Sequence, residues 1–153
     1  MSAVPEYCSN KASEAEIAEH LARCDSSFMP PLSCRVGIGA YAQKMASMAT
    51  RFEAWTGGTL IGLVAAYCND QENGVGYITS VSVLPAWTGN GIAARLMRLC
   101  VEHAKACGMR QISLEVATVN ANAIRLYQNS GFTAGETTDA AVIMHLSFES
   151  GTK

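Results

Sequence analysis

The chain has 153 residues, of which 49% are hydrophobic and only 16% are charged, and its formal net charge is −2. This length predicts a single domain with a sizeable core. The slight negative charge argues against nucleic-acid binding as the main task, because nucleic-acid-binding domains carry a basic face. No stretch approaches the roughly 18 to 20 uninterrupted apolar residues of a membrane span, and the first residues lack the basic-then-apolar plan of a signal peptide.

The cysteines and histidines suggest neither disulfides nor a metal site. The six cysteines contain no CxxC motif, and the three histidines show no recognised metal-ligand spacing. Cys100 and Cys107 lie two turns apart on a predicted helix, roughly 10 Å along its axis, which is too far for a disulfide. Without an export signal, reduced and largely buried thiols are expected, and the protein is expected in the cytoplasm.

The N-terminal third predicts two helices with a loop between them. Ser13 and Glu16 have the spacing of a capping box, which predicts a helix from Ser13 to about Asp25. The Pro30-Pro31 pair breaks helical structure, so residues 28–36 are expected to form a loop. Residues 40–49 then have the spacing of a short helix.

The middle of the chain predicts strands followed by a long helix. Residues 51–55 and 60–68 flank a glycine-containing turn, which indicates a β-hairpin. After a polar turn, residues 77–83 favour a strand that Pro85 ends, because proline cannot donate to a sheet ladder. From Ile92 the apolar spacing predicts a helix that ends at Gly108. The charges of the hairpin and the turn are expected to be solvated; they are Glu53, Asp70 and Glu72.

The turn between that strand and the long helix has the composition of a phosphate-binding site. Gly89 and Gly91 flank Asn90 where the helix begins. The first N–H groups of a helix lack intrahelical partners, the helix dipole adds positive charge, and glycines let an anion approach. A plain tight connection is the alternative. Ala94 stands where the dinucleotide fingerprint needs glycine and no Walker Lys-Ser/Thr follows, so neither nucleotide motif fits.

The C-terminal third predicts a strand, a helix and a closing pair of strands. Residues 112–116 form the strand, and Asn120 or Asn122 opens a helix that runs to about Asn129. Residues 131–136 and 141–148 then have the composition of two strands.

Two segments resemble the GNAT superfamily of N-acetyltransferases. VSVLPAWTGNGIAARLM, from Val81, is similar to its acetyl-CoA signature: Gly91 and Ala93 match the last two positions, and Thr88 stands where the family prefers Arg or Gln. ISLEVATVNANAIRLYQNSGF, from Ile112, resembles the later GNAT motif. Its matching positions are Asn120, Ala123, Ile124, Leu126, Tyr127, Gly131 and Phe132. The two segments occur in the family's order and together comprise 38 of the 153 residues.

The resemblance implies an α/β (α+β) fold over residues 1–153: a mixed, mostly antiparallel sheet, splayed near its centre, with helices on both faces. It also implies acetyl-CoA as co-substrate, with the pantetheine arm extended along the backbone of the strand and the phosphates on the glycine turn. Thr88 lacks the long polar side chain of the family, so backbone donors are expected to carry that contact. The implied cofactor-binding residues are Val81, Val83, Thr88, Gly89, Asn90, Gly91, Ile92, Ala93, Ala94 and Asn120.

Tyr127 matches the general acid of the family. A phenol with a pKa near 10 is protonated at neutral pH and can protonate the departing thiolate. Asn120, two helical turns earlier on the same side, is expected to orient the cofactor arm. A core tyrosine that packs the helix is the alternative. No carboxylate or histidine lies in residues 77–84, where some relatives carry a general base, so deprotonation of the amine through water is expected. Glu115, in the next strand, belongs to a pattern that is often structural.

The expected function is N-acetylation of a primary amine of a small molecule, such as an amino sugar or amino-acid derivative. Acetylation of a protein or peptide amine is one alternative, and a non-catalytic acetyl-CoA sensor is another. Phe28, Tyr41 and Met45 lie in the region that borders the acceptor site in the family, and they either line that site or belong to the core. The low charge content and the apolar run at residues 140–146 predict a homodimer, since GNAT proteins often pair through their C-terminal strands.

Overall fold

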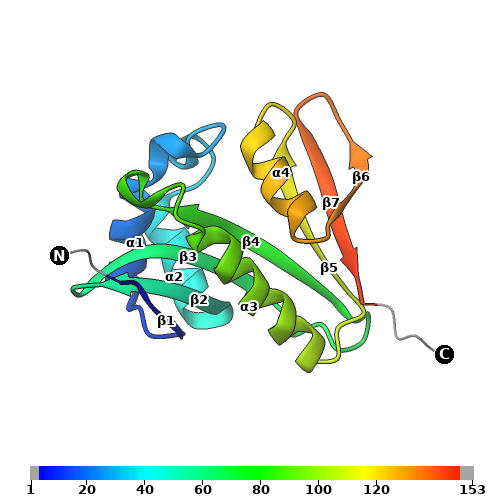
Figure 1. The fold of residues 1–153 in the computed structure, drawn as a ribbon, viewed down its shortest axis with the longest axis horizontal. Coiled ribbons are helices and arrows are strands. Elements are labelled where there is room, and N and C mark those ends of the chain that lie inside the picture. Colours follow the sequence, from blue (N-terminus) through cyan, green and yellow to red (C-terminus); the bar gives the residue numbers. More distant parts are fainter. Residues whose placement is uncertain (1–3, 149–153) are drawn as a thin grey trace.

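The structure, a computed structural model, describes residues 4–148. Within this range seven strands form one sheet in the order β1-β2-β3-β4-β5-β7-β6 (Figure 1). Neighbouring strands are antiparallel, except for β4 and β5, which are parallel. The strands are β1 Glu6–Ser9, β2 Thr50–Thr56, β3 Thr59–Tyr67, β4 Val75–Val83, β5 Gln111–Ala117, β6 Thr133–Thr137 and β7 Ala141–Ser147. The predicted fold class is confirmed.

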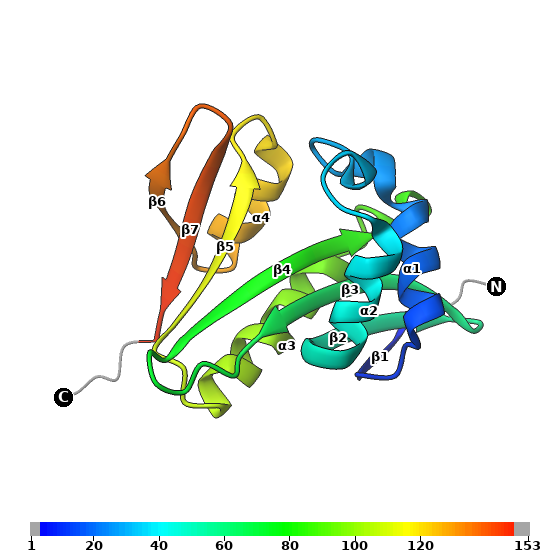
Figure 2. The same ribbon diagram turned by 180° about the vertical axis from the view of Figure 1, so that it is seen from behind.

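Helices cover both faces of the sheet, as predicted. Helices α1 (Glu14–Arg23) and α2 (Ile38–Met48) lie on one face, and α3 (Ile92–Ala106) and α4 (Ala121–Asn129) lie on the other (Figures 1 and 2). Two clusters of buried apolar residues fill the spaces between helices and sheet. Of the helices within residues 4–148, none has the length and apolar composition needed to span a bilayer.

The sheet splays between β4 and β5. These strands pair only where they begin, with Val75 opposite Gln111 and Tyr77 opposite Ser113, and they diverge beyond that point (Figure 1). In β4 the register with β3 passes from Ile78 to Ser80, so Thr79 forms a bulge at the start of the splay. The gap that results is bordered by the second half of β4 and by the end of β5.

Helix α3 lies close to the sheet because β3 carries a glycine beneath it. A Cβ atom at Gly62 would lie 2.8 Å from Ile92 Cγ2 and 3.1 Å from Leu96 Cδ1. Both of these side chains are buried at the start of α3. The missing side chain on β3 therefore sets how close the first turns of α3 lie to the sheet.

Local signals in the sequence place most elements correctly. Helix α1 begins with the predicted capping box: the Ser13 hydroxyl accepts from the Glu16 N–H at 3.2 Å, and the Glu16 carboxylate accepts from the Ser13 N–H at 2.9 Å. Strand β1 was not predicted. It is short, with two of its four residues exposed, and it is held by pairing with β2 rather than by an apolar pattern of its own.

The prediction that Glu53 is solvated is wrong. Its side chain is fully buried in β2, where it forms a 3.2 Å ion pair with Arg51. The carboxylate also accepts from the Trp55 indole N–H at 3.0 Å and from the backbone N–H groups of Lys11 and Ala12 at 3.0 to 3.2 Å. These donors compensate for the loss of water around the charge, and they tie the segment before α1 to the sheet.

Candidate active site

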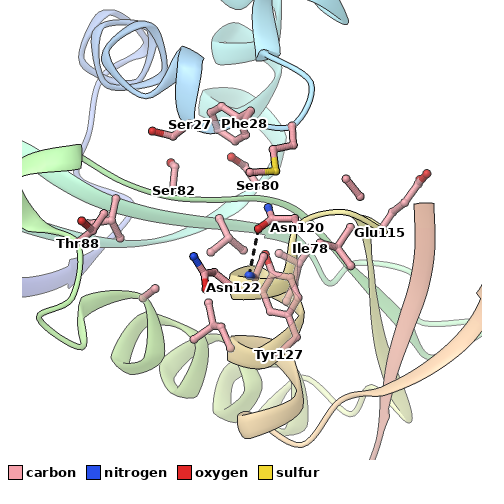
Figure 3. Close-up of a pocket in the computed structure, with 18 of the residues that line it drawn as sticks. Ser27, Phe28, Ile78, Ser80, Ser82, Thr88, Glu115, Asn120, Asn122 and Tyr127 are labelled. Carbon is pink, nitrogen blue, oxygen red and sulfur yellow. Dashed lines mark hydrogen bonds between the residues drawn. The ribbon is translucent and has the colours of Figure 1, made fainter. Parts of the chain in front are cut away.

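A cleft of about 780 Å³ opens where β4 and β5 diverge. Its walls are β4, the turn that opens α3, the end of β5, the start of α4 and the loop at residues 27–30 (Figure 3). All of the predicted site residues except Asn90 line this cleft: Val81, Val83, Thr88, Gly89, Gly91, Ile92, Ala93, Ala94, Asn120 and Tyr127. Residues that lie up to 46 positions apart in the sequence thus share one site.

The turn before α3 leaves the first N–H groups of the helix open toward the cleft. Gly91 is the N-cap residue and has a left-handed φ of 77°, and Gly89 has a φ of 82°. No side chain among residues 4–148 caps α3, and a Cβ at either glycine would meet nothing within 4 Å. The arrangement has free donors, the positive end of a helix dipole and open space, which together suit an anion.

Asn90 and Thr88 stabilise the turn itself. The Asn90 side-chain amide donates to the carbonyls of Trp87 and Thr88, at 2.9 and 3.3 Å. The Thr88 hydroxyl donates to the carbonyl of Pro85 at 3.0 Å. Both side chains thus contribute to the shape of the turn, and the donors that remain for an anion are backbone N–H groups.

The cleft-facing edge of β4 has unpaired backbone groups. The Leu84 N–H donates to the Ile61 carbonyl on β3 at 2.8 Å. Because successive residues of an antiparallel strand direct their backbone groups to opposite edges, Ser82 faces β3 as well, while Val81 and Val83 face the gap. An extended chain can therefore pair with Val81 and Val83.

The opposite wall is formed by α4. Asn120 is the N-cap of this helix, and its side-chain oxygen accepts from the Ala123 N–H at 3.2 Å (Figure 3). Tyr127 lies two turns further on, packs 6.3 Å from Phe132 between ring centres and is only 7% exposed. Burial raises the pKa of Tyr127 to about 12. This tyrosine lines the cleft and packs in the core, so the two interpretations of the sequence are not exclusive.

The sequence left open whether Phe28, Tyr41 and Met45 line the acceptor site or belong to the core, and the structure distinguishes them. Phe28 lines the cleft, whereas Met45 is fully buried on the inner side of α2, among the core residues on that face of the sheet. The Tyr41 hydroxyl donates to the carbonyl of Thr79 in the β4 bulge at 2.6 Å. Two charged residues also line the cleft, Arg35 and Glu115, and both are exposed.

One polar pair at the cleft was not anticipated. His20, on α1, lies 2.9 Å through Nδ1 from the Leu60 carbonyl and 2.9 Å through Nε2 from the Ser82 hydroxyl. A carbonyl only accepts, so Nδ1 carries the proton, and the Ser82 hydroxyl donates to Nε2. Alternation along β4 could have placed Ser80 and Ser82 on one face. Their partner, 62 positions away, carried no comparable signal.

The other two histidines lie outside the cleft. His103 packs on α3 against Phe52, with 5.5 Å between ring centres. His145, on β7, lies 2.8 Å through Nδ1 from the hydroxyl of Ser113 on β5. Within residues 4–148 there is no cluster of three or more His, Cys, Asp or Glu side chains that could hold a metal ion.

Comparisons with known proteins agree on the family. The model of the GNAT acetyltransferase family matches residues 17–132. A mycothiol acetyltransferase of Thermobispora bispora is 33% identical over 86 residues, which are 54% of this chain and 29% of that protein. The matches to curated relatives thus span about a quarter to a third of those proteins' length.

Solved structures show the same fold. A nourseothricin acetyltransferase is 30% identical, with a TM-score of 0.57 over 65% of each chain. A Bacillus subtilis acetyltransferase in complex with CoA is 15% identical, with a TM-score of 0.73 over 95% of this chain and 99% of that one. Acetyl-CoA is the co-substrate of this family. The chain belongs to the GNAT acetyltransferase family.

Proposed function

We propose that this chain, as one GNAT domain, transfers the acetyl group of acetyl-CoA to a primary amine of a small molecule, such as an amino sugar or an amino-acid derivative. One observation carries the proposal: a single cleft is lined by the uncapped N-terminus of α3, the open edge of β4 and Tyr127. These are the three groups that acyl transfer from a CoA thioester needs. They supply an anion cradle, a backbone that holds an extended arm and a proton donor.

The residues present fit acetyl-CoA. Backbone N–H groups from Gly89 to Ala94 hold the pyrophosphate, and Thr88 contributes through the turn that it stabilises. The backbone of Val81 and Val83 pairs with the pantetheine arm, which adds to β4 in the manner of a strand. The oxygen of Asn120 is occupied by its cap bond, so its side-chain N–H₂ is the group that orients the arm.

Tyr127 protonates the sulfur as the amine nitrogen bonds to the acetyl carbon and the C–S bond breaks. The phenol is the source of this proton because burial keeps it in the neutral form at physiological pH. The ring is held from behind by its packing in the core, which limits its reorientation during turnover.

A small acceptor is supported by the limited room in the cleft. Its volume of about 780 Å³ is shared between the co-substrate and the acceptor, and the loop at residues 27–30 closes one side of it. The names of two relatives, mycothiol acetyltransferase and nourseothricin acetyltransferase, point to small-molecule acceptors as well. Arg35 and Glu115 are the charged groups of the cleft and are available to bind an acceptor that carries both signs of charge.

Release of CoA, measured with a panel of amines, tests this function. The panel contains glucosamine, lysine methyl ester, spermidine and tyramine, with a peptide bearing a free N-terminus as the protein-like arm. Turnover with a small amine is expected. Turnover with the peptide alone would replace the small-molecule acceptor with a protein or peptide. Binding of acetyl-CoA without release from any amine would indicate a sensor.

We also propose that the protein is a homodimer in the cytoplasm. Strand β6 is exposed along its whole length at the end of the sheet, where a second copy can pair. The apolar run contributes less than expected, because Val142 and Met144 point into the core. The buried free thiols of Cys24, Cys68 and Cys100 suit a reducing compartment. A monomer by light scattering at micromolar concentration would overturn the homodimer. Recovery of the protein in an exported fraction would overturn the cytoplasmic location.

A further inference from the structure

The face of β4 opposite α3 presents two serines to the cleft. The side chains of Ser80 and Ser82 both point toward the loop that carries Ser27 and Phe28 (Figure 3). Ser82 is held from behind by His20, and His20 is held in turn by the carbonyl of Leu60. The two hydrogen bonds of the imidazole fix both its tautomer and its orientation, so the nitrogen that faces Ser82 is a proton acceptor.

Ser80 differs from Ser82 because its hydroxyl forms no well-aligned hydrogen bond within residues 4–148, although it lies near the Tyr41 hydroxyl. The side-chain oxygen is buried, and the residue is only 5% exposed. A buried hydroxyl without a partner destabilises a fold, so each such group calls for an explanation. Since Ser80 lines the cleft two residues from Ser82, rotation of its side chain would bring the buried hydroxyl to a ligand in the cleft.

We propose that Ser80 and Ser82 bind the nitrogen of the acceptor amine, and that Ser82 passes a proton from this nitrogen to His20. The inference rests on the acetyltransferase function proposed above. It replaces the water-relayed deprotonation expected from the sequence with a built relay. Ser82 touches the substrate in this arrangement, whereas His20 acts through Ser82.

The relay balances the reaction. As the amine nitrogen bonds to the acetyl carbon, it becomes cationic and therefore far more acidic than the free ammonium. It gives a proton to Ser82 Oγ while the Ser82 hydroxyl proton moves to His20 Nε2. The proton of Tyr127 goes to the departing sulfur, and CoA leaves as the thiol. Transfer of the proton from the His20 imidazolium to the Tyr127 phenolate through solvent then restores both groups.

The surroundings of His20 keep it ready to accept. The ring is 2% exposed, and burial, the larger effect, together with the nearby charge of Arg23 lowers the pKa of His20 below its usual value. The thiol of Cys24 lies 3.7 Å from Nε2, and burial raises the pKa of this thiol to about 11, so it stays neutral. His20 is therefore uncharged at neutral pH, and the relay fails only when acid protonates it.

Two substitutions and a matched control test the relay. Ser82→Ala removes the hydroxyl that receives the proton. His20→Gln retains an acceptor for Ser82 but cannot be protonated. Ser113→Ala is the control: Ser113 is buried to the same 8% exposure and contacts a histidine at 2.8 Å, but lies outside the cleft. Each variant is assayed by CoA release with the best amine of the panel, from pH 5 to 8, beside a melting curve.

We expect kcat to fall about 10²-fold in both cleft variants, at an unchanged KM for acetyl-CoA, and to hold in the control. In the wild type kcat should decline as the pH falls through the pKa of His20, and this decline should disappear in His20→Gln. Wild-type kcat in either cleft variant, or a persistent acidic decline in His20→Gln, would overturn the relay. Absence of turnover by the wild type with every amine would overturn the proposed function, and the relay with it.

Discussion

Helices α3 and α4 both begin at the cleft, but their first turns differ. Helix α3 starts at Gly91, and no side chain among the described residues caps it. Helix α4 starts at Asn120, whose own oxygen accepts from the Ala123 N–H. A side chain of α4 thus accepts a hydrogen bond from a first-turn N–H group, whereas the first-turn N–H groups of α3 have no such acceptor among the described residues. Under the proposed function, the open first turn of α3 would bind an anion at a cost in local stability, and the capped start of α4 would support the helix that carries Tyr127.

Gly91→Arg should have the largest effect. The wild type in acetyl-CoA at about 100 times its Kd should gain roughly 2.7 kcal/mol of stability. The variant should lose this gain entirely, because the arginine fills the space in front of the helix donors. Gly108→Arg is the control, since Gly108 lies at the other end of α3 with a similar φ of 80°. Differential scanning fluorimetry measures both, and a full acetyl-CoA shift in Gly91→Arg would remove this turn from the site.

Tyr127→Phe should lower kcat by about 10²–10⁴, the usual effect of a positioned proton donor, while the acetyl-CoA shift remains. Tyr67→Phe is the control, because it makes the same substitution outside the cleft, at a phenol oxygen that is buried and has no partner among residues 4–148. Tyr127 must be protonated to act as the acid, and its pKa is about 12. Ionisation of Tyr127 should therefore not reduce kcat of the wild type as the pH rises from 7 to 10. Steady-state kinetics decide, and wild-type turnover in Tyr127→Phe would make this tyrosine purely structural.

Asn120→Ala tests the other side of the comparison. Loss of the cap should lower stability by about 1 kcal/mol, or about 3 °C in Tm for a chain of this size. Ser13→Ala, which removes the cap of α1 far from the cleft, should cost a similar amount. The acetyl-CoA shift should stay complete in Ser13→Ala and be smaller in Asn120→Ala, which also loses the N–H₂ group that orients the arm. An Asn120→Ala variant with unchanged Tm and no acetyl-CoA shift would show that Asn120 serves the ligand rather than the helix.

Ser80→Ala should have the smallest effect, and its sign is informative. Like the first turn of α3, Ser80 has a polar group that the described chain does not satisfy. Removal of the hydroxyl should leave Tm unchanged or slightly higher, while KM for the amine rises about fivefold, equivalent to about 1 kcal/mol for one hydrogen bond. A lower Tm with an unchanged KM would mean that Ser80 has a structural partner instead.

Local signals in the sequence predicted much of the fold. The capping box at Ser13, the glycines around the α3 turn and Gly108 each act within a few residues, and the structure has helix ends at these places. The two GNAT-like segments carried the fold class, which pattern alone could not have specified. Ten of the eleven predicted site residues lie on one cleft because both segments flank the splay of β4 and β5.

Non-local contacts account for the features that the sequence did not predict. Strand β1 depends on its pairing with β2. Glu53 is buried because donors from the segment before α1 surround it, and a charge in a hairpin gives no local sign of this. The bond between His20 and Ser82 joins α1 to β4 across 62 positions. Such pairs follow from the way helices pack on the sheet, which periodicity within one element cannot reveal.

If acetyl-CoA binds as proposed, its affinity should depend on Gly62, a residue that does not line the cleft. The distance between the first turn of α3 and β3 is short because Gly62 has no side chain. Even one methyl group at this position would lie 2.8 Å from Ile92. A methyl at position 62 would lift the start of the helix and tilt its donors relative to the β4 edge. Calorimetric titration of Gly62→Ala with acetyl-CoA would report this as a weaker Kd. An unchanged Kd would mean that the helix adjusts without moving its first turn.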